Sequence, residues 1–408
     1  MTEPGRVSLA VPIGAGVVTA LVGFTSSFAV VLTGLRSVGA SEAQAASGLF
    51  AMSLVMALGI TGLALRYRIP ITLAWSTPGA ALLAGTGAVV GGWPAAVGAF
   101  VTVGLAIVLT GVWSGLGRVI ASIPVPLAQA MLAGVILPLC VEPVRALADN
   151  PAAVAPVVLT WIVFLRLSPR WAVPAAFAVA AVVIGISLIT NGSAVDARSL
   201  LPSLDLVAPT WTWQALVGIA LPLYIVTMAS QNIPGTAVMA SFGYTVPWRA
   251  AMTVTGLGTA VTAPAGVHAV NLAAISAALA AAPDAHPDKD RRWIAAVSAG
   301  ASYLVLAVAS AALATLVAMA PAGIVETVAG LALLATLAAS LAAALGDEAE
   351  RLPAAITFVV AASGVGIAGI GSAFWALVLG LVVRIGLART PMSIRGSRPT
   401  PPSTPPVR

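Results

Sequence analysis

The chain has 408 residues, of which 60% are hydrophobic and only 8% carry a charge. Because a soluble domain has about 25% charged residues, these proportions exclude a water-soluble fold and indicate an integral membrane protein. The formal net charge of +6 comes from basic residues that lie mostly in short loops and in the C-terminal tail. That distribution is typical of membrane orientation and does not indicate nucleic-acid binding.

The apolar residues occur in long runs and not in alternating ten-residue segments, which favours an α-helical bundle over a β-barrel. The first residues, MTEPGRVSLAVPIG, lack the features of a cleavable signal, so the first apolar run is predicted to be a true span. The single cysteine, Cys140, excludes an internal disulfide. The sequence has no cysteine–histidine cluster and no nucleotide-binding loop, so we expect no metal and no cofactor.

Charges, prolines and glycine-rich turns divide the chain into fourteen predicted transmembrane segments. In chain order they are residues 11–35, 44–65, 70–90, 94–116, 121–141, 151–167, 171–190, 211–231, 247–263, 266–282, 293–319, 322–345, 353–370 and 372–388.

The basic residues give these spans a direction. With the N-terminus in the cytoplasm, sixteen basic residues fall on the cytoplasmic side and three, Arg36, Arg145 and Arg198, fall outside. This bias predicts that both termini are cytoplasmic. The tail at 391–408 is rich in proline and arginine, so we expect it to be disordered.

Seven predicted spans precede the polar segment at 191–209, and seven follow it. Since seven is odd, the second half must enter the membrane in the opposite sense from the first. The sequence therefore predicts two inverted repeats, an architecture found in many secondary transporters.

The third span is interrupted. Residues 69–75, which end at Trp75, are largely β-branched or aromatic and predict a short extended strand. Ser76 or Thr77 is a suitable helix N-cap, and the proline and Gly79 that follow suit a first helical turn. We therefore expect a strand followed by a half-helix.

The tenth span is interrupted at the corresponding position of the second half. Residues 261–265 contain a proline and are predicted to be extended, and residues 266–270, which include Gly266 and His268, are predicted to turn the chain. Asn271 precedes the helix-forming sequence LAAISAALAA and is predicted to be its N-cap. Paired interruptions of this kind point to the binding site of a transporter.

A half-helix that begins inside the bilayer presents unpaired N–H groups and about half a positive charge. Two such ends facing each other would hold an anion without help from arginine or lysine, and neither residue lies near the middle of a predicted span. The alternative is that proline and glycine merely kink two ordinary helices, whose polar side chains bond to nearby backbone.

Further polar and aromatic residues complete the predicted site. Phe24 and Ser27 offer a ring and a hydroxyl in the first span. Gln231 and Asn232 end the eighth span, and they either line the site or tie the helices together. The predicted substrate-binding residues are Phe24, Ser27, Trp75, Ser76, Thr77, Gly79, Gln231, Asn232, Gly266, His268 and Asn271.

Three residues are candidates for carrying a proton. His268 is an ionisable residue within a predicted span and is therefore a functional candidate, with a neutral, packed imidazole as the alternative. Glu142 and Glu326 lie near the outer ends of the fifth and twelfth spans. Either could carry a proton if it is buried, and the alternative is a solvated carboxylate.

Four strings, TMASQNIPG (227–235), AVNLAAIS (269–276), AGLALLATL (329–337) and GIGSAFWALVLG (369–380), resemble the benzoate:proton symporter family, the BenE type. The likeness begins in the first span, at VGFTSSFAVVL, and continues to the last. It implies a bacterial inner-membrane carrier that imports an aromatic carboxylate with a proton. Position 268 is usually aromatic in that family, so His268 departs from the pattern and is weak evidence for a shared proton carrier.

That family is similar, more remotely, to the nucleobase and sulfate-permease transporters. This likeness implies fourteen spans in two inverted sets of seven, with the substrate between the third and tenth spans. It also implies a core domain, made of residues 1–117 and 206–320, that moves against a gate domain, made of residues 118–205 and 321–390.

The leading hypothesis is a secondary active symporter for an aromatic monocarboxylate, benzoate first of all. The alternatives are a passive anion channel or uniporter, which needs no proton carrier, and a carrier of another organic anion or a nucleobase. A membrane enzyme is disfavoured, because the sequence has no motif for metal, nucleotide or nucleophile-plus-base chemistry. The expected partners are the carboxylate, a proton and the lipid bilayer, and the oligomeric state stays open, a homodimer included.

Overall fold

The computed structural model describes residues 9–192 and 197–388, so the predicted tail at 391–408 lies outside the described residues. This part of the chain is mostly helical and contains one two-stranded ribbon. Eight of its helical stretches are long and apolar enough to cross a membrane: Ala10–Ser37, Glu42–Tyr67, Gly92–Val112, Val125–Asp149, Pro169–Thr190, Trp213–Ser241, Lys289–Ala318 and Ile324–Leu345.

Local sequence explains where several helices of the first half begin. Ser41 starts a helix with a capping box, in which its hydroxyl accepts the N–H of Gln44 and the Gln44 side chain accepts the N–H of Ser41. The predicted first span is split at Ser26 and Ser27 into two helices. The elements are α1 (Ala10–Thr25), α2 (Phe28–Ser37), α3 (Glu42–Tyr67), β1 (Leu73–Trp75), α4 (Thr77–Thr86), α5 (Gly92–Val112), α6 (Ser114–Ala121), α7 (Val125–Asp149), α8 (Pro151–Leu167) and α9 (Ala172–Thr190).

The second half also contains both long and short helices. Its elements are α10 (Trp213–Ala215), η3 (Leu216–Ala220), α11 (Leu221–Thr227), η4 (Met228–Asn232), α12 (Ile233–Ser241), α13 (Trp248–Thr262), β2 (Val270–Leu272), α14 (Ile275–Ala281), α15 (Trp293–Ala318), α16 (Ile324–Leu345), α17 (Arg351–Ala362) and α18 (Ser372–Ala388).

The eighth predicted span continues ten residues past its expected end, because the helix passes through Pro234. The segments η3 and η4 are π turns, and each directly precedes a helix that has a proline in its first turn, Pro222 or Pro234. A proline cannot donate to the helical ladder, and the wider turn before it accommodates the missing bond. The N–H of Ile233, for example, donates to the carbonyl of Met228.

The thirteenth predicted span is shorter than expected. Helix α17 ends at Ala362, and residues 363–371 form turns in which Gly364 and Gly369 have φ of 66° and 75°. Glycine adopts this left-handed region at little cost, so the glycine-rich sequence ends the helix early.

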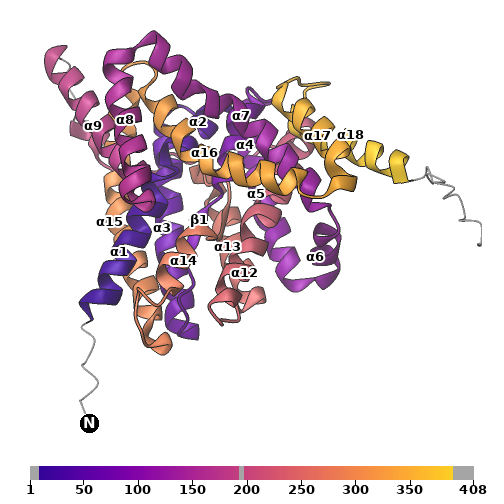
Figure 1. Cartoon of the computed structure of the whole chain (residues 1–408), viewed down its shortest axis with the longest axis horizontal. Coiled ribbons are helices and arrows are strands. Elements are labelled where there is room, and N and C mark those ends of the chain that lie inside the picture. The colour runs from indigo at the N-terminus through magenta and orange to yellow at the C-terminus, as the bar shows by residue number, and fades with distance from the viewer. Residues whose placement is uncertain (1–8, 193–196, 389–408) are drawn as a thin grey trace, which may run out of the picture.

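The helices form two sets, and within each set neighbouring helices pack along one another (Figure 1). Helix α3 packs along α15, which also packs along α1, while α5 packs along α13. The last of these contacts is close, because a Cβ on Gly104 would lie 2.5 Å from the backbone N of Ala260. In the second set, α16 and α17 pack against α7, and α8 packs against α9.

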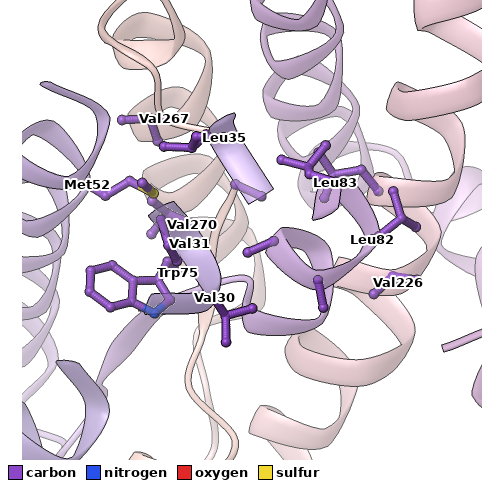
Figure 2. Packing of buried hydrophobic residues seen from close by; sticks show 14 of the residues in the cluster. Val30, Val31, Leu35, Met52, Trp75, Leu82, Leu83, Val226, Val267 and Val270 are labelled. Carbon is purple, nitrogen blue, oxygen red and sulfur yellow. The ribbon is translucent and has the colours of Figure 1, made fainter. Parts of the chain in front are cut away.

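The ribbon is buried in the interior of this bundle. Figure 2 shows Trp75 and Val270 of the two strands beside Val31 of α2 and Met52 of α3. All four side chains are at most 2% exposed. Packing against α2 and α3 therefore supports the strands, which short strands need because they are marginal on their own.

Candidate functional site

The two strands pair antiparallel, with Ala74 opposite Asn271. Hydrogen bonds of 3.0 Å continue the pairing at both ends, from the N–H of Ser76 to the carbonyl of Ala269 and from the N–H of Ala273 to the carbonyl of Thr72. Irregular backbone at membrane depth is tolerated only where protein buries it or water lines it. The ribbon meets this condition and places the starts of α4 and α14 in the protein interior.

The structure confirms the predicted strand, cap and half-helix of the third span. Ser76 is the N-cap of α4, and its hydroxyl accepts the N–H of Gly79 at 3.2 Å. Pro78 occupies the first turn, where its missing N–H costs nothing. Thr227 of α11 donates to the same Ser76 hydroxyl at 2.9 Å, so the start of α4 is fixed from two directions.

The details predicted for the tenth span are wrong. Residues 261–265 are helical and not extended, since α13 continues to Thr262 and a 3-10 turn follows. Asn271 lies inside β2 and is not a cap, and α14 begins four residues later with Ala274 at its N-cap. The prediction failed because the strand is defined by pairing with residues almost two hundred positions away. A turn at Gly266 is confirmed, with φ of 101°.

A cavity of about 80 Å³ lies where the starts of α4 and α14 meet α1 and α16. It is smaller than the roughly 300–1,000 Å³ of most small-molecule sites, so binding of a ligand requires the cavity to widen. No charged side chain lines it among the described residues. The lining residues are Val22, Gly23, Ser26, Ser27, Ala74, Trp75, Thr77, Pro78, Gln231, Ala273, Ala274, Ser276, Ala332 and Thr336.

Three hydroxyls form a row along one side of the cavity. Thr77 at the start of α4 donates to Ser27 at 2.8 Å, and Ser27 lies 3.3 Å from Ser26. Ser26 in turn donates to the carbonyl of Gly23 at 3.2 Å. The break between α1 and α2 is thus joined to the start of α4, and the row presents polar groups that carry no net charge.

The two adjacent amides of η4 have different positions in the structure. Gln231 lines the cavity, and its side chain makes no hydrogen bond within the described chain. Asn232 is fully buried, and its Oδ1 accepts the N–H of Leu272 at 2.9 Å. Gln231 is therefore available to a ligand, whereas Asn232 holds β2 in place.

Aromatic residues form a cluster behind the cavity. Trp75 is among its lining residues, and Phe24 lies 5.2 Å from Trp75 between ring centroids. Phe24 also stacks on Phe28 at 5.6 Å, and Phe28 meets the edge of Phe177 at 5.0 Å. Phe24, predicted to touch the substrate, is fully buried and does not line the cavity in this structure.

Two predicted glycines have packing roles and do not line the cavity. A Cβ on Gly79 would lie 2.4 Å from the Cδ1 of Leu223, so this glycine lets α4 pack against α11. Gly266 packs against Gly48 of α3, where a Cβ would lie 3.0 Å from the Cα of Gly48. Both are needed for close approach, as small residues are at interfaces between membrane helices.

His268 is fully buried and lies beside the ribbon, not in the cavity lining. Its Nε2 is 3.0 Å from the carbonyl oxygen of Ser76. A carbonyl only accepts, so Nε2 carries the proton and donates. Nδ1 has no partner among the described residues, and the edge of the ring faces Phe100 at 6.3 Å between centroids. A second proton would create a buried charge without a counter-charge in this conformation.

The two acidic candidates lie away from the cavity. Glu142 forms an ion pair with Arg145 at 2.7 Å, and Glu326 is exposed in the first turn of α16. Asn271, also predicted to bind substrate, is buried. Its Nδ2 donates to the carbonyl of Leu272, while its Oδ1 has no partner within residues 9–192 and 197–388.

The structure also adds residues that the sequence did not suggest. Ser276 lies in the first turn of α14 and lines the cavity, as do Ala332 and Thr336 of α16. Ser276 could have been found by starting the half-helix at Ile275. Thr336 has no such signal, because it belongs to a regular apolar helix and reaches the cavity only through packing.

Comparisons with known proteins identify relatives of this chain. A model of the family described as benzoate membrane transport protein (BenE) matches residues 7–385. The chain is 39% identical over 378 residues to the inner membrane protein YdcO of Escherichia coli (strain K12), covering 91% of this chain and 95% of that protein. It is 28% identical over 378 residues to the benzoate membrane transport protein of Acinetobacter baylyi, with 90% and 93% covered.

Two solved structures have a similar fold. The transmembrane domain of the cyanobacterial bicarbonate transporter BicA matches with a TM-score of 0.58 and 13% identity, over 94% of this chain and 98% of that chain. The murine anion transporter Slc26a9 in its inward-facing state matches with a TM-score of 0.60 and 12% identity, over 94% and 69%. At this level of identity the similarity concerns the fold alone.

Proposed function

Since this chain belongs to the family of benzoate membrane transport proteins and is a multi-pass membrane transporter, we propose that it imports an aromatic monocarboxylate, benzoate first of all, together with a proton. The observation that carries this proposal is the composition of the cavity wall. Hydroxyl and amide groups lie beside one aromatic ring, and no charged side chain is present among the lining residues described.

The carboxylate end of the substrate is assigned to the polar wall. Gln231 has a free amide, and Thr77 and Ser27 have hydroxyls that can turn toward a ligand. The N–H groups at the start of α14 have no side-chain cap among the described residues, and amides at a helix start favour an anion. An anion can therefore be held by neutral donors.

The aromatic end is assigned to Trp75. Trp75 is a lining residue of the cavity, and its ring packs against Phe24. Aromatic rings prefer offset or edge-to-face contact with one another, worth about 0.5–1.5 kcal/mol beyond the buried area. A benzoate ring would gain this contact, whereas a small inorganic anion would not.

We assign the movement to the proposed core domain (residues 1–117 and 206–320) against the proposed gate domain (118–205 and 321–390). The cavity supports this division, because α1, α4 and α14 form most of its wall while Ala332 and Thr336 come from α16. Sliding the core domain past the gate domain would open the cavity to either side of the membrane. The proposal includes fourteen spans in two inverted repeats, with both termini in the cytoplasm.

Among the three candidate proton carriers, we propose His268. It is the candidate that contacts the ribbon, through its bond to the carbonyl of Ser76. Movement of the core would have to give Nδ1 a polar partner before it could be protonated. The rival is a uniporter, which is favoured by the absence of a titratable side chain among the described lining residues.

Labelled benzoate uptake into proteoliposomes tests the proposal. With an alkaline interior, uptake should exceed that of protein-free liposomes, which measure passive entry of benzoic acid, and a protonophore should abolish the excess. Uptake above this control that ignores the pH gradient would identify a uniporter. Uptake equal to the control for benzoate and for other aromatic acids would reject the proposed substrate class.

A further inference from the structure

A long apolar groove runs between α3 and α13, apart from the substrate cavity. It is lined by Val55, Leu58, Gly59, Gly62, Leu63, Arg66 and Tyr67 of α3 and by Ala250, Val254 and Gly258 of α13. Leu58 is 62% exposed, and a Cβ on Gly62 would meet no atom within 4 Å. No other described element fills the groove.

The lining residues recur at helical spacing along each helix. From Val55 to Arg66 the groove follows α3 for roughly 16 Å at 1.5 Å per residue. That length is about half of the hydrocarbon thickness of a bilayer. Its side chains are apolar or absent until Arg66. The groove therefore matches one acyl chain of a lipid in shape and chemistry.

The polar end of the groove is basic and aromatic. A second hollow shares Tyr67, Ala250 and Val254 with the groove and adds Trp248 and Arg249. Arg66 lies over the Tyr67 ring at 5.3 Å. Both guanidinium groups are exposed, and neither forms an ion pair in the part of the chain that the structure describes.

Tryptophan and tyrosine are enriched where membrane proteins cross the headgroup region, and basic pockets between membrane helices bind anionic headgroups. We propose that this groove binds an anionic phospholipid, with one acyl chain between α3 and α13 and the phosphate between Arg66 and Arg249. No carboxylate occurs among the described residues of either hollow, so the ammonium group of a zwitterionic lipid finds no partner there and is repelled by the arginines.

The groove lies on the helices that hold the ribbon. Leu73 of β1 packs at Gly59, where a Cβ would lie 2.5 Å from its Cδ1, and the N–H of Val270 donates to Thr259 of α13 at 2.9 Å. A lipid in the groove would contact both helices and hold them together. The bound lipid should therefore raise the melting temperature of the protein.

Native mass spectrometry of the delipidated full-length protein, with equimolar dioleoyl phosphatidylglycerol and phosphatidylcholine, tests this site. The wild type should retain phosphatidylglycerol preferentially, and the double variant Arg66→Gln/Arg249→Gln should lower that preference by about fivefold or more. Gly62→Leu should fill the groove and lower retention of both lipids.

Matched control variants separate a built site from general surface charge. Arg166→Gln/Arg170→Gln removes two exposed arginines that line neither hollow, and Gly185→Leu adds a side chain to open space on α9. Both should behave as the wild type. The proposal is overturned if Arg66→Gln/Arg249→Gln keeps the wild-type preference, or if the arginine control loses it equally.

Discussion

The two short helices that begin at the ribbon differ in what satisfies their first N–H groups. At α4, the hydroxyl and the carbonyl of Ser76 accept the N–H groups of Gly79 and Ala80, and Pro78 has no N–H. At α14, which begins after Ala274, no described side chain caps the helix. We call β1 with α4 the closed unit, because its first N–H groups are satisfied and it offers a ligand only side-chain hydroxyls. We call β2 with α14 the open unit, because it offers a ligand backbone amides.

The strands before these helices also differ in the groups that hold them in place. Strand β2 is held by side chains of its neighbours, since Asn232 accepts the N–H of Leu272 and Thr259 accepts the N–H of Val270. The closed unit is tied instead through Ser76, which Thr227 and His268 both contact. Substitutions that remove these hydrogen bonds should therefore separate effects on stability from effects on binding.

We expect the largest effect on affinity from Gln231→Ala. The side chain lines the cavity without a partner in the described chain, so its loss should weaken benzoate binding about tenfold or more, as for a hydrogen bond to a charged group. Isothermal titration calorimetry checks this, with Gln129→Ala on α7 as the control. Unchanged affinity in Gln231→Ala would remove this amide from the site.

Asn232→Ala should be the most destabilising change at the ribbon. It leaves the N–H of Leu272 buried without an acceptor, which costs about 1–3 kcal/mol. Asn271→Ala is the matched control, because it removes a buried Oδ1 that has no partner in the described chain along with one hydrogen bond, from Nδ2 to the carbonyl of Leu272, and these two contributions should largely offset each other. Thermal unfolding measures both. The reverse order of the two variants would contradict the role of Asn232 in holding β2.

The two serines at the helix starts should act on different quantities. Ser76→Ala removes a cap and should lower stability by about 0.5–2 kcal/mol. Ser276→Ala should leave the melting temperature unchanged and lower affinity for benzoate, because Ser276 lines the cavity. Equal loss of stability in both variants would contradict the distinction between a closed and an open unit.

The smallest effect on binding is expected from His268→Gln. His268 does not line the cavity, so benzoate affinity should stay within about twofold of the wild type, well below the loss of one hydrogen bond to a charged group. Glutamine cannot take up a proton, and uptake driven by a pH gradient should fall to the level seen with a protonophore. If gradient-driven accumulation persists, the proton travels by another route.

The closed unit could be predicted from sequence, and the open unit could not. Ser76 and Pro78 are local signals of a helix start, and the β-branched residues within 69–72 together with Trp75 indicate an extended segment before them. Asn271 gives the same local signal but lies in a strand, because pairing with Ala74 determines its conformation. A three-residue strand has no periodicity of its own, so only its distant partner reveals it.

For the remaining site residues, too, the local sequence does not determine which of them line the cavity. The neighbouring amides Gln231 and Asn232 are indistinguishable in sequence, and the π turn decides that one lines the cavity and the other binds β2. Thr336 enters the site because α16 packs there. The local sequence thus indicates which side chains have groups suitable for binding a ligand. Long-range packing determines which of them line the cavity together.

The most direct test of the central claim is a structure of the protein with 4-iodobenzoate, whose iodine is located by its anomalous scattering. The account predicts one ligand with its ring beside Trp75 and its carboxylate toward Gln231 and the start of α14. An iodine site elsewhere in the protein, with the cavity empty, would contradict it.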